Sequence, residues 1–217
     1  MALLGSAQIT TAALAIVARD GYKALTMSGL ARSLNVAPSA LYNHVSSKQD
    51  VLILVQDRLM ARVDVSGFDT LPWADAVRAW AHSYRDAFSS HLPLIPFIAL
   101  LPITNAPQTV HMYEAVAAGF QKAGWPGEKI IDAIVALESF IYGSAYDVNA
   151  SEDIFDTGNL AGDAPHFTDA VAARARGGRN PADSAFELGL DALVAGLAAA
   201  LAGPGQPAPT AGTAVGR

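Results

Sequence analysis

Side chains that could read DNA bases gather in a short stretch of the sequence, residues 38–48. Asn43 carries an amide that can form two hydrogen bonds with adenine, Ser39 a hydroxyl that can bond a base or a phosphate, and Ala40 a methyl group that fits against thymine. His44 adds a polar ring beside them. On the outer face of a helix, these residues could contact base edges in the major groove of DNA.

Three nearby residues are suited to the DNA backbone. The hydroxyls of Thr26 and Tyr42 and the ammonium of Lys48 can bind phosphates, contacts that position a protein on DNA without reading its sequence. Each assignment has an alternative: Tyr42 and His44 can pack on their own domain, and Lys48 can be a solvated surface charge. For the segment as a whole, the alternative is an ordinary helical hairpin inside a core.

Short helices in residues 1–63 are expected to position these side chains. Leu30, Leu34 and Leu41 supply an apolar inner face, and residues 35–37 form the tight connection of a helix-turn-helix. The expected helices run from the N-cap Ser6 to Gly21, from the N-cap Thr26, from Pro38 to His44, and from Ser46 or Ser47, with Gln49 or Asp50 completing a capping box, to about Val63.

Charge is distributed unevenly along the chain. Residues 1–63 hold six basic and three acidic residues, a net charge of +3, whereas residues 64–217 hold eight basic and 17 acidic residues, a net charge of −9. A cationic end on an acidic body suits a DNA-binding head on a separate regulatory domain, although short segments also differ this much by chance.

The composition excludes several classes of protein. The 217 residues are 52% hydrophobic, enough for a sizeable core. They include no cysteine, which excludes disulfides, thiol nucleophiles and cysteine-ligated metals. The most apolar window, residues 92–103, contains three prolines and is too short to span a bilayer. Because the N-terminus also lacks the basic segment of a secretory signal, we expect a cytoplasmic protein with no membrane partner.

The rest of the chain predicts a larger helical domain, so the expected fold class is all-α. Helical periodicity is strongest over residues 127–147, and the prolines within 92–103 require a kinked or split segment. Residues 149–181 are expected to be a mobile connection with at most one short helix. Other helices are expected at about 72–90, 107–123 and 182–202. The predicted domains are a three-helix helix-turn-helix domain at 1–48 with a linker helix at about 47–63, a regulatory and dimerisation domain at 64–202, and a disordered tail at 203–217.

Residues 25–52, LTMSGLARSLNVAPSALYNHVSSKQDVL, resemble the DNA-binding domain of the TetR family of bacterial transcriptional repressors. The segment LYNHVSSK at 41–48 is most similar to the tetracycline-repressor branch, and the preceding DGYKALTM fits the same pattern. A weaker resemblance continues through HLP at 91–93 and FIYGSAYD at 140–147.

The resemblance implies a role in DNA binding for each matching residue. It makes Thr26 the phosphate-binding cap of the second helix and Lys48 a phosphate contact at the start of the fourth. Ser28 stands where the tetracycline branch has a base-reading arginine, and no Lys or Arg precedes Arg19. Both departures weaken the electrostatic share of DNA binding. The implied recognition-helix residues are Ser39, Ala40, Tyr42, Asn43 and His44.

Aromatic and histidine side chains in the larger domain are candidates for a mostly apolar ligand pocket, and the resemblance implies a small-molecule effector there. At helical spacing, such residues are more often plain core. His82 and Asp86 share a helical face, but no metal-binding signature accompanies them, so we expect neither a metal nor a cofactor. The candidate ligand-binding residues are Trp80, Tyr84, Phe88, His91, Phe97, His111, Tyr113 and Phe140.

Small residues of the last helix, including Gly189 and Gly196, allow another helix to approach closely. The resemblance places a four-helix dimer contact here, formed by residues 127–147 and the last helix of two subunits. A two-fold dimer matches a palindromic operator.

We therefore expect a homodimeric repressor that a small apolar or amphipathic molecule releases from DNA. One alternative, motivated by Ser28, is a helical ligand- or partner-binding dimer with weakened DNA binding. The other is an enzyme, for which the sequence contains no catalytic signature.

Overall fold

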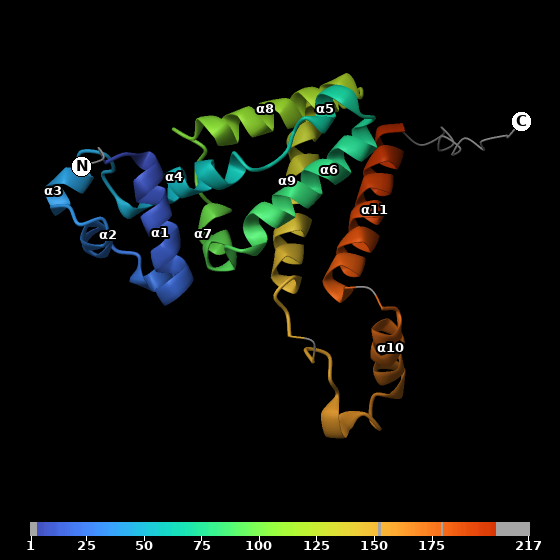
Figure 1. Cartoon of the computed structure of the whole chain (residues 1–217). Coiled ribbons are helices and arrows are strands. Elements are labelled where there is room, and N and C mark those ends of the chain that lie inside the picture. Colours follow the sequence, from blue (N-terminus) through green and yellow to red (C-terminus); the bar gives the residue numbers. More distant parts are fainter. Residues whose placement is uncertain (1–3, 152, 179, 203–217) are drawn as a thin grey trace, which may run out of the picture.

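The computed structural model describes residues 4–151, 153–178 and 180–202. Within these ranges every regular element is a helix (Figure 1), which confirms the all-α prediction. Figure 1 shows a small N-terminal head joined through one helix to a larger helical body. The tail expected to be disordered, residues 203–217, lies outside the described residues.

The head contains α1 (Ser6–Asp20), α2 (Met27–Ser33) and α3 (Pro38–Tyr42), with a 3₁₀ turn, η1 (Tyr22–Ala24), after α1. Thr26 caps α2 as expected, because its hydroxyl accepts a hydrogen bond from the Gly29 N–H at 3.0 Å. The turn between α2 and α3 includes Asn35 at φ 54°, a left-handed conformation that Asn tolerates. Leu30 and Leu41 are fully buried beneath this turn. The predicted helix-turn-helix is therefore confirmed.

Three predicted helix ends in this region are wrong. The N-cap of α1 is Gly5 rather than Ser6, and no side chain caps that helix. The third helix ends at Tyr42 with Asn43 as its C-cap, so His44 lies beyond it. The linker helix α4 (Lys48–Met60) stops short of Val63 because its last turn tightens, with the N–H of Val63 donating to the Met60 carbonyl.

The helix α4 joins head and body through two consecutive side chains. The guanidinium of Arg58 donates to the Ala7 carbonyl at 3.1 Å and to the Thr10 hydroxyl at 2.9 Å, which fixes α1. The Asp57 carboxylate accepts from the N–H of Thr109 at 2.9 Å and from its hydroxyl at 3.2 Å, which caps a helix of the body. The start of α4 has the expected capping box, made by Ser47 and Asp50.

The body is built around α6 (Trp73–Ser89), which packs against both α9 (Gly127–Asp147) and α11 (Pro181–Ala202). Its other long helix is α8 (Pro107–Lys122), which contacts α4 and α9. These bounds match the predicted ranges closely, because each helix has a Pro at or next to its first residue and a strong apolar face. The apolar residues of head and body form one continuous core.

Shorter elements complete the body. The proline-rich segment is split, as predicted, into a 3₁₀ turn, η2 (Leu92–Leu94), and the short helix α7 (Ile95–Ile98). A four-residue helix, α5 (Gly67–Thr70), was not expected, because four residues are too few to show a helical period.

The connection from α9 to α11 projects from the rest of the body (Figure 1). It contains the 3₁₀ turn η3 (Gly158–Leu160) and one α-helix, α10 (Pro165–Arg176), none of whose residues is buried. The segment was expected to hold at most one short helix, but its described residues form the 12-residue α10 as well as η3, with Pro165 favouring the start of α10, so the segment has more regular structure than expected.

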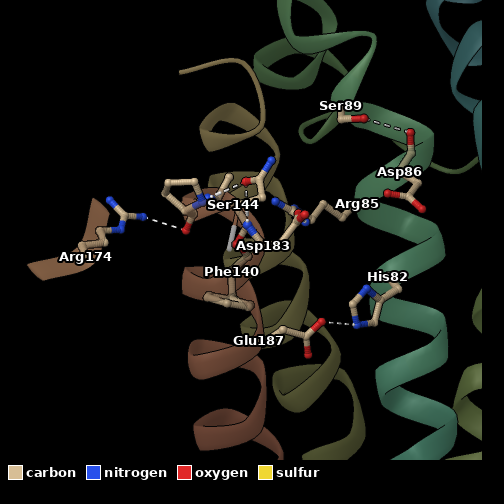
Figure 2. Close-up of polar contacts among 12 residues, drawn as sticks. His82, Arg85, Asp86, Ser89, Phe140, Ser144, Arg174, Asp183 and Glu187 are labelled. Carbon is tan, nitrogen blue, oxygen red and sulfur yellow. Dashed lines mark hydrogen bonds and ion pairs between the residues drawn. The ribbon is translucent and has the colours of Figure 1, made fainter. Parts of the chain in front are cut away.

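A series of three ion pairs links α6 to α11. The pairs join Arg78 with Asp191, His82 with Glu187 and Arg85 with Asp183, at distances of 2.9, 3.0 and 2.8 Å. Figure 2 shows the last two, with the side chains of His82 and Arg85 pointing from α6 toward α11. Because the acidic residues recur every four positions and the basic ones every three or four, the two helices keep one register.

The contact between α8 and α5 depends on Gly119, and we predict that Gly119→Ala destabilises the protein. An added Cβ would lie 2.3 Å from Cδ1 of Phe68, a buried side chain. Overpacking of this kind costs about 1–3 kcal/mol, and the better helix propensity of Ala recovers only about 0.5–1 kcal/mol. Thermal unfolding should show a Tm lower by about 2–6 °C. Gly127→Ala is the matched control, since nothing lies within 4 Å of its added Cβ, and an equal effect of both changes would contradict the prediction.

Candidate functional site

The short helix α3 exposes the polar side chains expected to contact DNA. Ser39, Asn43 and His44 are exposed, as is Tyr42, half of whose surface is accessible (51%). Ala40 is half-buried. Leu41, on the opposite side, is fully buried and holds α3 against the head. The head therefore presents these residues together on one outer surface, where they can reach a binding partner.

Thr26 and Ser28 lie at the start of α2 and are both exposed. The hydroxyl oxygen of Thr26 accepts the helix-capping bond from Gly29, while its hydroxyl hydrogen stays available to a phosphate oxygen. Ser28 is a short neutral side chain in the first turn of α2, so it brings no positive charge to this surface.

The Lys48 side chain is held in place rather than freely solvated. Its Nζ lies 3.6 Å from the centre of the Tyr22 ring and donates to the Tyr22 carbonyl at 3.2 Å. The other face of the Tyr22 ring stacks on Phe97 of α7, with ring centres 3.5 Å apart. Tyr22 was not among the predicted site residues, although it belongs to the DGYKALTM segment that carries the resemblance. Phe97, a candidate ligand residue, thus lies at the contact between head and body.

The remaining ligand candidates lie in several separate places. Trp80, Tyr84 and Phe88 are fully buried and form a row of ring contacts along α6, with neighbouring centres 5.5 and 5.2 Å apart. Phe140 lies elsewhere, stacked on Phe186 of α11 with ring centres 5.5 Å apart. His111 is exposed on α8. The predicted set therefore does not converge on one place.

His91 is half-buried just after α6. Burial, with a smaller contribution from the positive charge of Arg62, lowers its pKa, so its neutral form is favoured. Arg62 follows α4, which places this histidine near the linker helix rather than in the aromatic row.

Four polar groups meet inside the body, where α6, α8 and α9 approach one another. The hydroxyls of Tyr84 and Tyr113 both donate to Oε1 of Glu138, at 2.8 and 2.7 Å. The Tyr142 hydroxyl lies 2.8 Å from that of Tyr84. We call these four residues the tyrosine–glutamate cluster. Glu138 and Tyr142 were missed by the sequence analysis, although their spacing of four residues on a strongly periodic helix places them on one face.

Burial sets the protonation of this cluster. It raises the pKa of Glu138, an effect that the hydrogen bonds from Tyr113 and Tyr84 oppose. It also raises the pKa of Tyr84, Tyr113 and Tyr142 above the ordinary value, so the three phenols stay protonated at neutral pH and act as donors. The cluster offers hydroxyl groups and one carboxylate in otherwise apolar surroundings.

The described residues were also considered as ligands of a metal ion and as a membrane-spanning helix. No group of three or more His, Asp or Glu side chains in those residues is arranged to hold a metal ion. One helix there, Pro181–Leu201, is long and apolar enough to cross a membrane by length and composition, and 17% of its most apolar window is buried.

Comparison with known proteins places both parts of the chain. Residues 9–55 match the family model "Bacterial regulatory proteins, tetR family", and residues 69–201 match "Tetracyclin repressor-like, C-terminal domain". An HTH-type transcriptional regulator of Saccharopolyspora erythraea is 30% identical over 91% of this chain and 86% of its own length. The class E tetracycline repressor of Escherichia coli is 26% identical over 93% of this chain and 94% of its own length.

A solved structure extends the similarity to the whole fold. The Streptomyces coelicolor TetR family protein ActR, in complex with actinorhodin, matches with a TM-score of 0.76 and 26% identity, over 95% of this chain and 99% of that one. Both family models match in chain order, and they cover the head and the body described above. The chain belongs to the TetR family and is a DNA-binding transcriptional regulator with an N-terminal helix-turn-helix.

Proposed function

We propose that the protein is a homodimeric repressor that binds a palindromic operator and is released by a small molecule bound in its helical body. The observation that carries the proposal is the exposed polar face of α3, anchored by buried Leu41 beside the fixed ammonium of Lys48. Residues 1–48 act as the DNA-binding domain, α4 as the link, and residues 64–202 as the regulatory domain, all in the cytoplasm.

Contacts with DNA divide into two kinds in this proposal. Ser39 and Ala40 from α3, and Asn43 and His44 from the turn that follows it, read base edges in the major groove. Thr26, Ser28, Tyr42 and Lys48 bind phosphates or the bases next to them. The head carries a net charge of +3, which is modest for a DNA-binding domain. Base contacts therefore supply a larger share of the affinity, because few phosphates are neutralised.

Homodimerisation is supported by apolar surface left exposed on α9 and α11. Leu188 is 75% exposed, Ile131 62% and Val135 52%, far more than large apolar residues of these helices show on the core side. Small residues surround Leu188 on α11, so a second helix pair can approach closely. The acidic residues of α11 that pair with α6 lie on a neighbouring face of the same helix, and this favours a protein contact over insertion into a membrane. A two-fold dimer would place its two α3 helices about one turn of DNA apart, or a multiple of it.

An effector site in the body is supported by the tyrosine–glutamate cluster, which sits where α6, α8 and α9 meet. ActR, a relative of known structure, is described in complex with actinorhodin. In this chain α8 is tied to α4 through Asp57 and Thr109, so a ligand that moves α8 would also move the link to the head. Coupling of this kind typically amounts to about 1–3 kcal/mol and is reciprocal between the two sites.

A second candidate function keeps the dimer and its ligand but not operator binding. Ser28 and the lack of basic residues before Arg19 favour it. Binding of the chain to its own upstream intergenic DNA, compared with a scrambled duplex over a range of salt concentrations, separates the two. Equal, weak binding to both duplexes would favour the second candidate.

The proposed DNA contacts predict different effects for changes at Asn43 and Lys48. Asn43→Ala should weaken binding to the operator duplex by about 1–3 kcal/mol while leaving binding to a scrambled duplex unchanged, because a base contact is lost. Lys48→Gln should weaken both and reduce the slope of log affinity against log salt by about 1, because one phosphate contact is lost. Fluorescence anisotropy measures both effects. Lys129→Gln on α9 makes the same charge change far from the head and should have neither effect.

The proposed dimer interface predicts that a charge at Leu188 separates the two subunits. Leu188→Glu places a charge in the middle of the proposed interface and should shift the protein from dimer to monomer in analytical ultracentrifugation, because an unpaired carboxylate is costly to bury. Affinity for a duplex with two half-sites should then fall to that for a single half-site. Leu100→Glu, at a residue that is 85% exposed beyond α7, is the matched control. A dimer that persists in Leu188→Glu, or a monomeric wild-type protein, would contradict this assignment.

A further inference from the structure

Glu138 retains hydrogen-bonding capacity at the centre of the tyrosine–glutamate cluster. Both recorded donors, Tyr84 and Tyr113, bond to Oε1. Among the described residues, no hydrogen bond to the other carboxylate oxygen, Oε2, is recorded. Since a carboxylate accepts at both oxygens, Oε2 can take a donor from a bound molecule.

Among the residues that the structure describes, no cationic side chain pairs with this carboxylate. The ion pairs recorded for the described residues involve Arg19, Arg78, His82 and Arg85, and Glu138 belongs to none of them. The titratable groups that face it are phenols, Tyr84 from α6, Tyr113 from α8 and Tyr142 from its own helix. Burial raises its pKa despite two hydrogen bonds, so the charge destabilises the ligand-free protein. A carboxyl group kept at such a cost in a polar cluster is a candidate for ligand recognition.

Aromatic side chains lie on the same side of the body as the carboxylate: Tyr84 and Tyr113 bond to it through their hydroxyls, and the Tyr142 hydroxyl lies 2.8 Å from that of Tyr84. The ring of Tyr142 meets those of Tyr84 and Phe88 at steep angles, 78° and 86°, with centres 5.5 and 5.3 Å away. Electron-rich ring faces attract cations, and most strongly where water is excluded. Tyr84 and Phe88 are fully buried, whereas Tyr113, Glu138 and Tyr142 each keep some accessible surface. The carboxylate side of the cluster is therefore its accessible side.

We infer that the body binds an organic cation, an apolar or aromatic molecule with a protonated amine whose N–H donates to Glu138 Oε2 while the partly exposed rings of Tyr113 and Tyr142 pack on its charge and hydrocarbon part. The inference rests on the effector site proposed above and defines the chemical class of its ligand. A neutral hydroxyl donor would gain one hydrogen bond without neutralising the carboxylate, and an anion would be repelled by it. A metal ion would find one carboxylate and neutral phenols, a poor set of ligands.

Direct binding to the full-length protein tests the inference. Three probes of equal ring size are compared: 9-aminoacridine, which is a cation with N–H donors at neutral pH, anthracene-9-methanol, which is neutral, and anthracene-9-carboxylate. Binding is followed by probe fluorescence without DNA, since acridines themselves bind duplexes. The cation should bind at least tenfold more tightly than the anion. Glu138→Gln should lose at least tenfold for the cation and less than twofold for the neutral probe.

Glu114→Gln, which removes an exposed acid from α8, is the control for general attraction to an acidic protein and should change nothing. Failure of the cation to bind the wild type, equal binding of the anion, or an unchanged affinity in Glu138→Gln would each overturn the inference. The proposed function is judged separately, by operator binding. If a neutral or anionic molecule released the operator, the repressor would stand and the cation assignment would fail. If the protein bound the cation but no operator DNA, the cation assignment would stand and the repressor would fail.

The pH dependence of stability supplies an independent prediction. The folded-state pKa of Glu138 lies above its ordinary value, so the carboxyl costs no stability at low pH, and the cost grows as pH rises through the unfolded and then the folded pKa. Glu138→Gln keeps an oxygen acceptor for both tyrosines but carries no charge. Its Tm should exceed that of the wild type by about 1–4 °C at neutral pH and match it near pH 4. A variant less stable than the wild type at neutral pH would show that the charge stabilises the free protein and would count against a binding role.

Discussion

The structure depends on α4 being shared between two bodies of unequal size. Its neighbouring residues Asp57 and Arg58 point to different sides of the helix, because successive residues lie about 100° apart. Arg58 ties α1 of the head to α4, and Asp57 caps α8 of the body. Neither the head nor α8 can change its angle to α4 without losing a charge-assisted hydrogen bond, so the position of the head follows that of the body.

Within the body, apolar contacts stabilise the packing of the helices, whereas polar contacts determine which residues face each other. The apolar row along α6 and the stacked rings of Phe140 and Phe186 hold the helices together. The ion pairs between α6 and α11 are mostly exposed and contribute little energy, but they define which residues face each other. The tyrosine–glutamate cluster holds a carboxylate that has no positive partner among the described residues, and burial raises its pKa, so its charge lowers stability rather than adding to it. Because the apolar contacts stabilise the fold, the body can hold a polar cluster that adds no stability and is proposed to bind the ligand.

Much of the fold could be predicted from the sequence. Strong periodicity and terminal prolines gave the long helices of the body almost to the residue, and the Thr26 cap, the turn at Asn35 and the capping box of Ser47 and Asp50 are local signals that the structure confirms. The short α5 could not be predicted, since its existence depends on Phe68 packing against Gly119, a contact far apart in sequence. The same holds for the site in the body. Glu138 stands out as a site residue only because Tyr84 of α6 and Tyr113 of α8 bond to it. These contacts join three different helices, so the spacing of residues along one helix cannot predict them.

The contact of Lys48 with the Tyr22 ring has a kinetic and entropic consequence. A free lysine on a protein surface samples many rotamers, and immobilising it on a phosphate costs about 0.5–1.5 kcal/mol. Here the ring and the carbonyl of Tyr22 already restrict the side chain, and Phe97 supports the ring from the body. If Lys48 binds a phosphate as proposed, the head therefore meets DNA with this cation preorganised. Because the support comes from α7, a rearrangement of the body that withdrew Phe97 would restore the freedom of the lysine and shorten the lifetime of the complex, without any change in the residues that read the bases.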